Sequence, residues 1–217
     1  MLRGELRAMI RGELNDTGGT PLWGDALLNE WINEAIRGYA RELPEEASIT
    51  IVAVAGQESY ALPARFLQVM RVEQPKTIVR RPGTPSRTLP GDAVDFQGRV
   101  GRTGVWAYRM FAGSLILDPA PIAIGADEDI RFEYLRAYAE PAADGDVLAT
   151  PAMDDEVLIQ LTCARALRWI GTDESKRARF ERDRGASPMA QAEAYEQAAL
   201  RLMATRQKRV RAGVLQA

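Results

Sequence analysis

Apolar residues near the start of the chain recur every three or four positions, which is the spacing of one face of an α-helix. A first such stretch covers residues 2–14 and ends in a polar, glycine-containing break. A second runs from about Asp25 to Leu43, with Asp25 placed to cap the helix start and Pro44 just past its end. Trp31 and Tyr39 anchor its wide apolar face, which comprises Leu28, Trp31, Ile32, Ala35, Ile36, Tyr39 and Leu43.

Helical spacing returns in the last third of the chain. Thr150 and Pro151 supply a cap followed by proline at the first helical position. Ser187 and Pro188 repeat these signals and open a last helix that we expect to continue beyond Arg209. That helix is rich in alanine and only weakly amphipathic, so we expect it to complete its burial against another chain. The buried stripe predicted for the earlier helix is Val157, Leu158, Leu161, Ala164 and Leu167.

The middle of the chain alternates apolar and polar residues with a period of two, which is typical of β-strands. The stretch 80–104, rich in Gly, Pro and Arg, predicts a long loop. Ala112 and Gly113 join two strands as a two-residue hairpin. The strands are predicted around Ile49–Val54, Ser59–Leu62, Phe66–Glu73, Trp106–Phe111, Ser114–Leu117 and Ile130–Tyr138, the last with Ile130, Phe132 and Tyr134 on one face. The order of helices, strands and helices predicts an α+β fold.

The composition of the chain excludes several classes of protein. No apolar stretch approaches the ~20 residues that cross a bilayer, and the start of the chain lacks the pattern of a signal peptide. A single cysteine excludes an internal disulfide and fits a reducing cytoplasm. The formal net charge of −2 argues against a general nucleic-acid binder, which normally carries a basic excess.

The residue types that most catalysts require are scarce. The chain has no histidine, which excludes Ser–His–Asp and Cys–His pairs and removes the usual zinc ligands. Cys163 lies among apolar residues, so we expect a buried structural thiol. Acidic clusters at 127–129, 144–146 and 154–156 lack the spacing of a calcium loop and are explained as turn acids and helix N-terminal acids. We therefore assign no catalytic residue, metal ligand or cofactor.

Two basic features remain, and each has two interpretations. They are either a solvated loop and a helix C-terminus favoured by cations, or docking elements for a partner with an acidic, hydrophobic groove. The loop carries Arg80, Arg81, Arg87, Arg99 and Arg102. The end of the chain carries Arg201, Arg206, Lys208, Arg209 and Arg211, followed by the apolar residues Val214 and Leu215.

The ordered set of motifs resembles the head-to-tail adaptor (connector) proteins of tailed bacteriophages. The likeness covers residues 1 to about 170. It lies in Leu22-Trp23-Gly24-Asp25 before Leu28-Asn29-Glu30-Trp31-Ile32-Asn33-Glu34-Ala35, in Ala55-Gly56-Gln57-Glu58-Ser59-Tyr60-Ala61-Leu62-Pro63 and Phe66-Leu67-Gln68-Val69, in Leu115-Ile116-Leu117-Asp118-Pro119-Ala120-Pro121 and Phe132-Glu133-Tyr134, and in residues 144–151 before an apolar helix.

The resemblance implies a helical bundle formed by residues 1–45 and 150–217, with a β-rich insertion at 46–149 and a long C-terminal helix. Similar proteins form a ring, usually twelvefold, beneath the portal of the DNA-filled head. By that likeness, residues 188–217 contact the portal protein, and the loop 80–104 faces a neighbouring copy or the tail. DNA is then only passing cargo, no membrane is involved, and the protein is assembled in the host cytoplasm into the neck of the virion.

Three other functions stay open at this point. One is a different neck or tail-completion component, such as a stopper, on a similar scaffold. Another is a cell-wall hydrolase with paired carboxylates, because its two acids need no fixed spacing along the chain. The last is a DNA-binding assembly factor, which would lose affinity steeply with salt.

Overall fold

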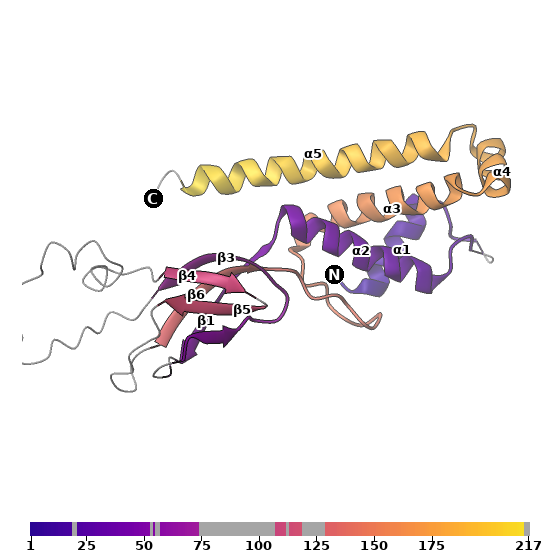
Figure 1. Ribbon diagram of the computed structural model, residues 1–217. Helices are drawn as coiled ribbons and strands as arrows, with labels where there is room; N and C mark the ends of the chain where they lie inside the picture. Colours follow the sequence, from indigo (N-terminus) through magenta and orange to yellow (C-terminus); the bar gives the residue numbers. More distant parts are fainter. Residues whose placement is uncertain are drawn as a thin grey trace, which may run out of the picture. The chain divides into compact units, whose positions relative to one another are not determined.

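The chain folds into two compact units in a computed structural model (Figure 1). The structure describes residues 1–18, 21–52, 54, 57–73, 107–111, 113–118 and 129–214. One unit combines Met1–Pro44 with Ala137–Ala217 and is helical, and the other is Glu45–Arg136 and is built of strands. The α+β fold with helices at both ends is thus confirmed. Residues 137–149, which the sequence analysis assigned to the insertion, go with the helical unit in this division.

The helical unit is organised around one central helix, α3. Both α1 and α2 from the start of the chain pack on α3, and the long α5 lies along it (Figure 1). The elements are α1 Arg3–Glu13, α2 Asp25–Glu42, the 3₁₀ turn η2 Ala152–Asp154, α3 Asp155–Gly171, α4 Glu174–Arg184 and α5 Pro188–Val214. The last helix therefore begins at the predicted proline and continues beyond Arg209, as expected.

The core of this unit comes largely from the predicted apolar faces. Trp31 and Tyr39 are 5% and 2% exposed, which confirms both as core anchors. Their rings pack at centroid distances of 6.0 Å from Trp169 and 5.5 Å from Tyr138. The helix α3 is buried on most sides, through Val157, Leu158, Ile159, Thr162, Cys163, Ala164, Ala166, Leu167 and Ile170, while Leu161 is half-buried.

Two predicted helix caps are wrong. Asp25 lies inside the first turn of α2, and its carboxylate forms ion pairs with Arg7 and Arg11 while no side-chain cap bond forms. Thr150 does not cap α3, because a 3₁₀ turn separates the two, and its hydroxyl is buried without a hydrogen-bond partner among the described residues. In both places a tertiary contact or an inserted turn overrides the local signal.

The N-terminal helix is attached to the rest of the unit by a row of arginines. Arg3, Arg7 and Arg11 follow one another every four residues, and their side chains are only 9%, 15% and 16% exposed. The carboxylate of Asp144 accepts hydrogen bonds from Arg3 at 3.0 Å and from Arg7 at 2.6 Å. The hydrogen bonds from these two guanidinium groups, of which that from Arg7 has the larger effect, lower the pKa of Asp144 to about 2. Arg11 pairs with Asp16 in the same manner.

The second unit consists of two three-stranded antiparallel sheets in the described residues, with orders β1-β6-β3 and β2-β5-β4. The strands are β1 Glu45–Val52, β2 Ser59–Ala61, β3 Phe66–Glu73, β4 Ala107–Phe111, β5 Ser114–Asp118 and β6 Asp129–Arg136. The predicted hairpin is confirmed, because Phe111 pairs with Ser114 and Gly113 has the positive φ of +75° that such a turn requires.

A small core of its own holds the strand unit together. Ile130, Phe132 and Tyr134 are buried on one face of β6, as the alternation predicted. They cluster with Val72 of the same sheet, and Tyr60 and Leu115 of the other sheet belong to the same cluster. The two sheets therefore bury their apolar faces against each other, so the unit has a core separate from that of the helices.

Candidate functional site

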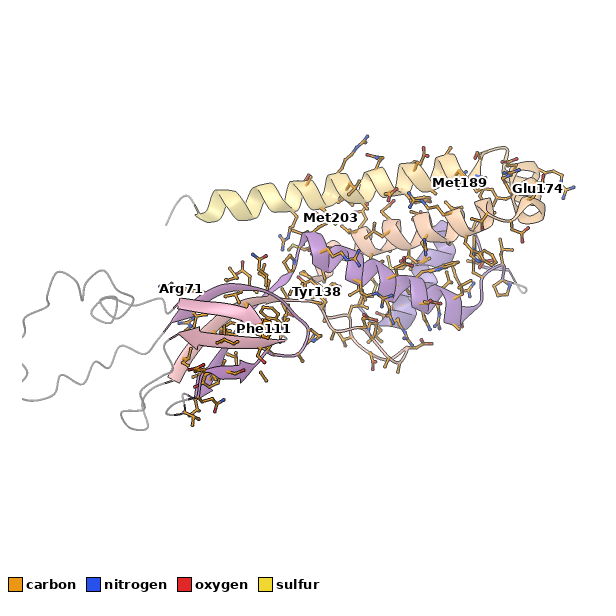
Figure 2. The ribbon with its side chains drawn as sticks, in the orientation of Figure 1. Arg71, Phe111, Tyr138, Glu174, Met189 and Met203 are labelled. Atoms are coloured by element: carbon orange, nitrogen blue, oxygen red, sulfur yellow. The ribbon has the colours of Figure 1, made fainter. Side chains whose placement is uncertain are left out.

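The candidate site is the C-terminal half of α5, and its position follows from how α5 packs on α3. At one end Met189 lies against Gly171, where an added Cβ would stand 2.6 Å from the methionine sulfur. Further along, Ala192, Ala199 and Met203 are 0%, 0% and 5% exposed. Figure 2 labels Met189 near the start of α5 and Met203 further along it. The small alanines let the two backbones approach closely. Because residue 189 meets the end of α3, the two helices run antiparallel.

A buried polar cluster fixes the other end of this contact. The carboxylate of Asp154 is buried just before α3 and accepts a 2.7 Å hydrogen bond from the hydroxyl of Tyr39 on α2. Arg206 of α5 approaches the same carboxylate with its Nε at 3.6 Å. Burial raises the pKa of the Tyr39 hydroxyl, and the hydrogen bond to Asp154 raises it further. The cluster joins α2, the turn before α3 and α5, so Arg206 has a partner within its own chain.

The last two turns of α5 extend past the start of α3. Arg206 stands level with Asp154, the residue that precedes α3, and α5 continues to Val214. Eight further residues at 1.5 Å each make an extension of about 12 Å. The predicted docking residues Lys208, Arg209, Arg211 and Val214 all lie on its helical backbone. Arg201 is exposed five positions before Arg206, and Leu215 lies outside the described residues.

The predicted loop site belongs to the part of the chain outside the described residues. Its residues, Arg80, Arg81, Arg87, Arg99 and Arg102, all lie outside the described residues. The basic features therefore separate into three groups. Arg206 contacts Asp154 within the bundle, the residues from 208 onward lie beyond that contact, and the loop arginines stay a prediction.

Two of the residues considered for chemistry, Asp146 and Cys163, have structural roles, while Asp127 and Glu128 of the first acidic cluster lie outside the described residues. The carboxylate of Asp146 accepts hydrogen bonds from the backbone N–H groups of Ala142 and Ala143, as expected of a turn acid. Cys163 is fully buried, and burial raises the pKa of its thiol to about 12, so the thiolate is strongly disfavoured at neutral pH. Within the described ranges, no group of three or more His, Cys, Asp or Glu side chains is arranged to hold a metal ion.

Sequence reasoning missed two sets of residues that organise the helical unit. The spacing of Arg3, Arg7 and Arg11 by four was a visible signal of one charged helix face. By contrast, the contact between Tyr39 and Asp154 joins residues 115 positions apart, and no local sequence pattern indicates it.

The fold and the candidate site together define a mixed α+β protein with a β-rich insertion, whose candidate contact surface is a long basic helix end. Comparison with known families agrees with this class: the family model described as SU10 adaptor protein matches residues 1–216. The chain therefore belongs to the SU10 adaptor protein family and is a phage adaptor protein, a class with a structural role in the virion. No curated protein matches the chain. Among the described residues, no helix has the length and apolarity needed to cross a membrane.

Proposed function

We propose that the protein is the head-to-tail adaptor subunit that forms a ring beneath the phage portal. The ring, twelvefold by its resemblance to other adaptors, connects the DNA-filled head to the tail or to a stopper or tail-tube protein and lets DNA pass. The observation that carries the proposal is the family match over almost the whole chain, which gives the adaptor class.

The register of α5 supports a docking role for its end. A helix that ended with the bundle would stop near Arg206, where its contact with Asp154 lies. Instead α5 continues to Val214, and its last turns carry Lys208, Arg209 and Arg211 with no acid after Glu196. A basic helix that extends from a folded support suits an acidic, apolar groove on a partner. The proposed partner at this end is the portal protein.

The near-neutral charge of the chain supports a conduit through which DNA slides. A wall with a large basic excess would bind phosphates and hold the duplex, with an affinity that falls steeply with salt. A formal net charge of −2 provides no such excess. DNA is therefore proposed as cargo and not as a ligand.

The docking site is tested with the portal protein from the same source in a co-sedimentation assay. We expect the full chain to sediment with portal rings and a chain lacking residues 207–217 not to. The cut is placed after Arg206 because Met203 is buried and Arg206 contacts Asp154. Removal of residues 201–217 would therefore damage the bundle itself.

Charge reversal provides a matched control for the truncation. The triple variant K208E/R209E/R211E should lose portal binding, whereas R177E on α4, an exposed arginine away from the site, should bind as the wild type does. Failure of the full chain to bind portal rings would contradict the proposed function. Normal binding by the truncated chain would contradict only the site.

A further inference from the structure

A groove between α2 and α3 has an apolar floor and a basic rim. Its floor is formed by Trp31, Ala35 and Leu161, and Gly38 opens it further because nothing lies within 4 Å of where its Cβ would be. Its volume of about 220 Å³ exceeds the ~150 Å³ of a cavity that holds benzene. There is room for one long apolar side chain.

The rim carries three arginines and one acid, so an acidic partner is favoured. Arg41 is exposed and has no ion-pair partner among the described residues. Arg37 pairs with Glu140 at 2.7 Å and Arg165 with the rim acid Glu34 at 3.1 Å, but both pairs are about half exposed. Exposed pairs of this kind contribute little and exchange readily for another carboxylate.

The same unit carries an exposed apolar residue next to acids. Met153 lies in the 3₁₀ turn before α3 and is 69% exposed. Asp155 and Glu156 follow it at the start of α3, where one carboxylate oxygen of Asp155 is buried and Glu156 is exposed. The buried contact between Asp154 and Tyr39 fixes the turn, so Met153 projects from a rigid base. Methionine is unbranched and polarisable, and it fills irregular apolar sites well.

We propose that the groove of one copy binds the Met153 turn of a second copy. Met153 fills the apolar floor, and the rim arginines, Arg41 above all, face the exposed Glu156 of the second copy. Groove and turn are different surfaces, so the contact between copies is heterologous. Interfaces of this type can repeat around a closed ring. The inference rests on the proposed function, in which copies lie side by side in a ring, and names the residues of that lateral contact.

Crosslinking between two different variants tests the contact directly. G38C places a thiol in the groove and M153C places one on the turn, while the native Cys163 thiol is buried and unreactive. We expect a short bismaleimide to join the two variants when they are mixed in the presence of portal protein. A mixture of G38C with V147C, a substitution at an equally exposed position, should give no such product.

Exchanging the charges of Arg41 and Glu156 tests their pairing between copies without a crosslink. We expect R41E and E156R each to raise the dissociation constant for self-association by about fivefold or more. The double variant R41E/E156R should recover wild-type association, because each copy then carries the reversed pair. Far-UV circular dichroism checks that these exposed substitutions leave the fold intact.

The outcomes separate this contact from the proposed function. A chain that sediments with portal rings but yields no crosslink between positions 38 and 153 keeps its function and loses the proposed contact. The contact is also overturned if the control mixture crosslinks equally or if the double variant associates more weakly than either single variant. A crosslink without portal binding supports the contact and counts against the function.

Discussion

At the scale of single residues, three arginines of the described part of the chain join segments that are distant in the sequence. Arg3 and Arg7 on α1 converge on Asp144, and Arg206 on α5 reaches Asp154, so each joins segments distant in the sequence. The planar guanidinium suits such contacts because it donates several hydrogen bonds in a fixed geometry. The sequence predicted a docking role for Arg206 and did not indicate its internal partner, since Asp154 lies 52 positions away along the chain.

The pairing of Asp144 predicts how stability depends on pH. Folding lowers the pKa of Asp144 to about 2, so the ionised carboxylate stabilises the folded state. This contribution is fully present above the ordinary pKa near 3.8 and is lost as the pH falls through about 2. We expect D144N to lower the free energy of unfolding at pH 7 and to flatten its decrease between pH 4 and 2.

Urea unfolding at several pH values measures this effect. The fluorescence of Trp23, Trp31 and Trp169, three of the four tryptophans, reports on the helical unit. The control is E193Q, which changes an exposed acid on α5. An unchanged pH dependence in D144N would show that the arginine pairing does not contribute.

At the scale of elements, prediction succeeded where apolar periodicity is strong. The helix α2 and the strand β6 bury the faces that their patterns indicated. The helix α4 was missed, because its sequence is almost entirely charged and Phe180 is the apolar residue that it buries. The cap predicted at Thr150 failed because a 3₁₀ turn, invisible to local signals, precedes α3.

The packing of α2 on α3 predicts a large cost for removing Trp31. This side chain is 5% exposed and packs against Trp169. We expect W31A to lower the free energy of unfolding by about 3–5 kcal/mol through lost burial and the cavity left behind. M9A, at a position that is 51% exposed, should change it by no more than about 0.5 kcal/mol. A thermal midpoint for W31A equal to that of M9A would refute the core assignment.

The attachment of α5 depends on a buried carboxylate with few donors. In Y39F the carboxylate of Asp154 loses its 2.7 Å hydrogen bond, and Arg206 at 3.6 Å does not replace it. We expect a loss of about 1–3 kcal/mol in the free energy of unfolding, the cost of leaving a buried acceptor unpaired. Hydrogen exchange should also become faster in the second half of α5. Wild-type exchange there would mean that the cluster does not hold this helix.

At the scale of the whole molecule, the chain combines a helical unit from both ends with a strand unit inserted between them. Sequence patterns predicted the order of helices, strands and helices, and the resemblance implied that both ends form one bundle and that the chain belongs to the adaptor class, which the family match supports. They could not predict the groove between α2 and α3, because it is formed by residues from two helices more than a hundred positions apart. They also could not show that α5 extends past the bundle, which depends on its register against α3.

The central claim is that this adaptor forms a ring on the portal. The most direct measurement is electron microscopy of the purified protein mixed with the portal protein from the same source. We predict a second ring stacked coaxially on each portal ring, and the image would also give its symmetry. Portal rings that are intact but bare would contradict the account and would favour another place in the neck or tail.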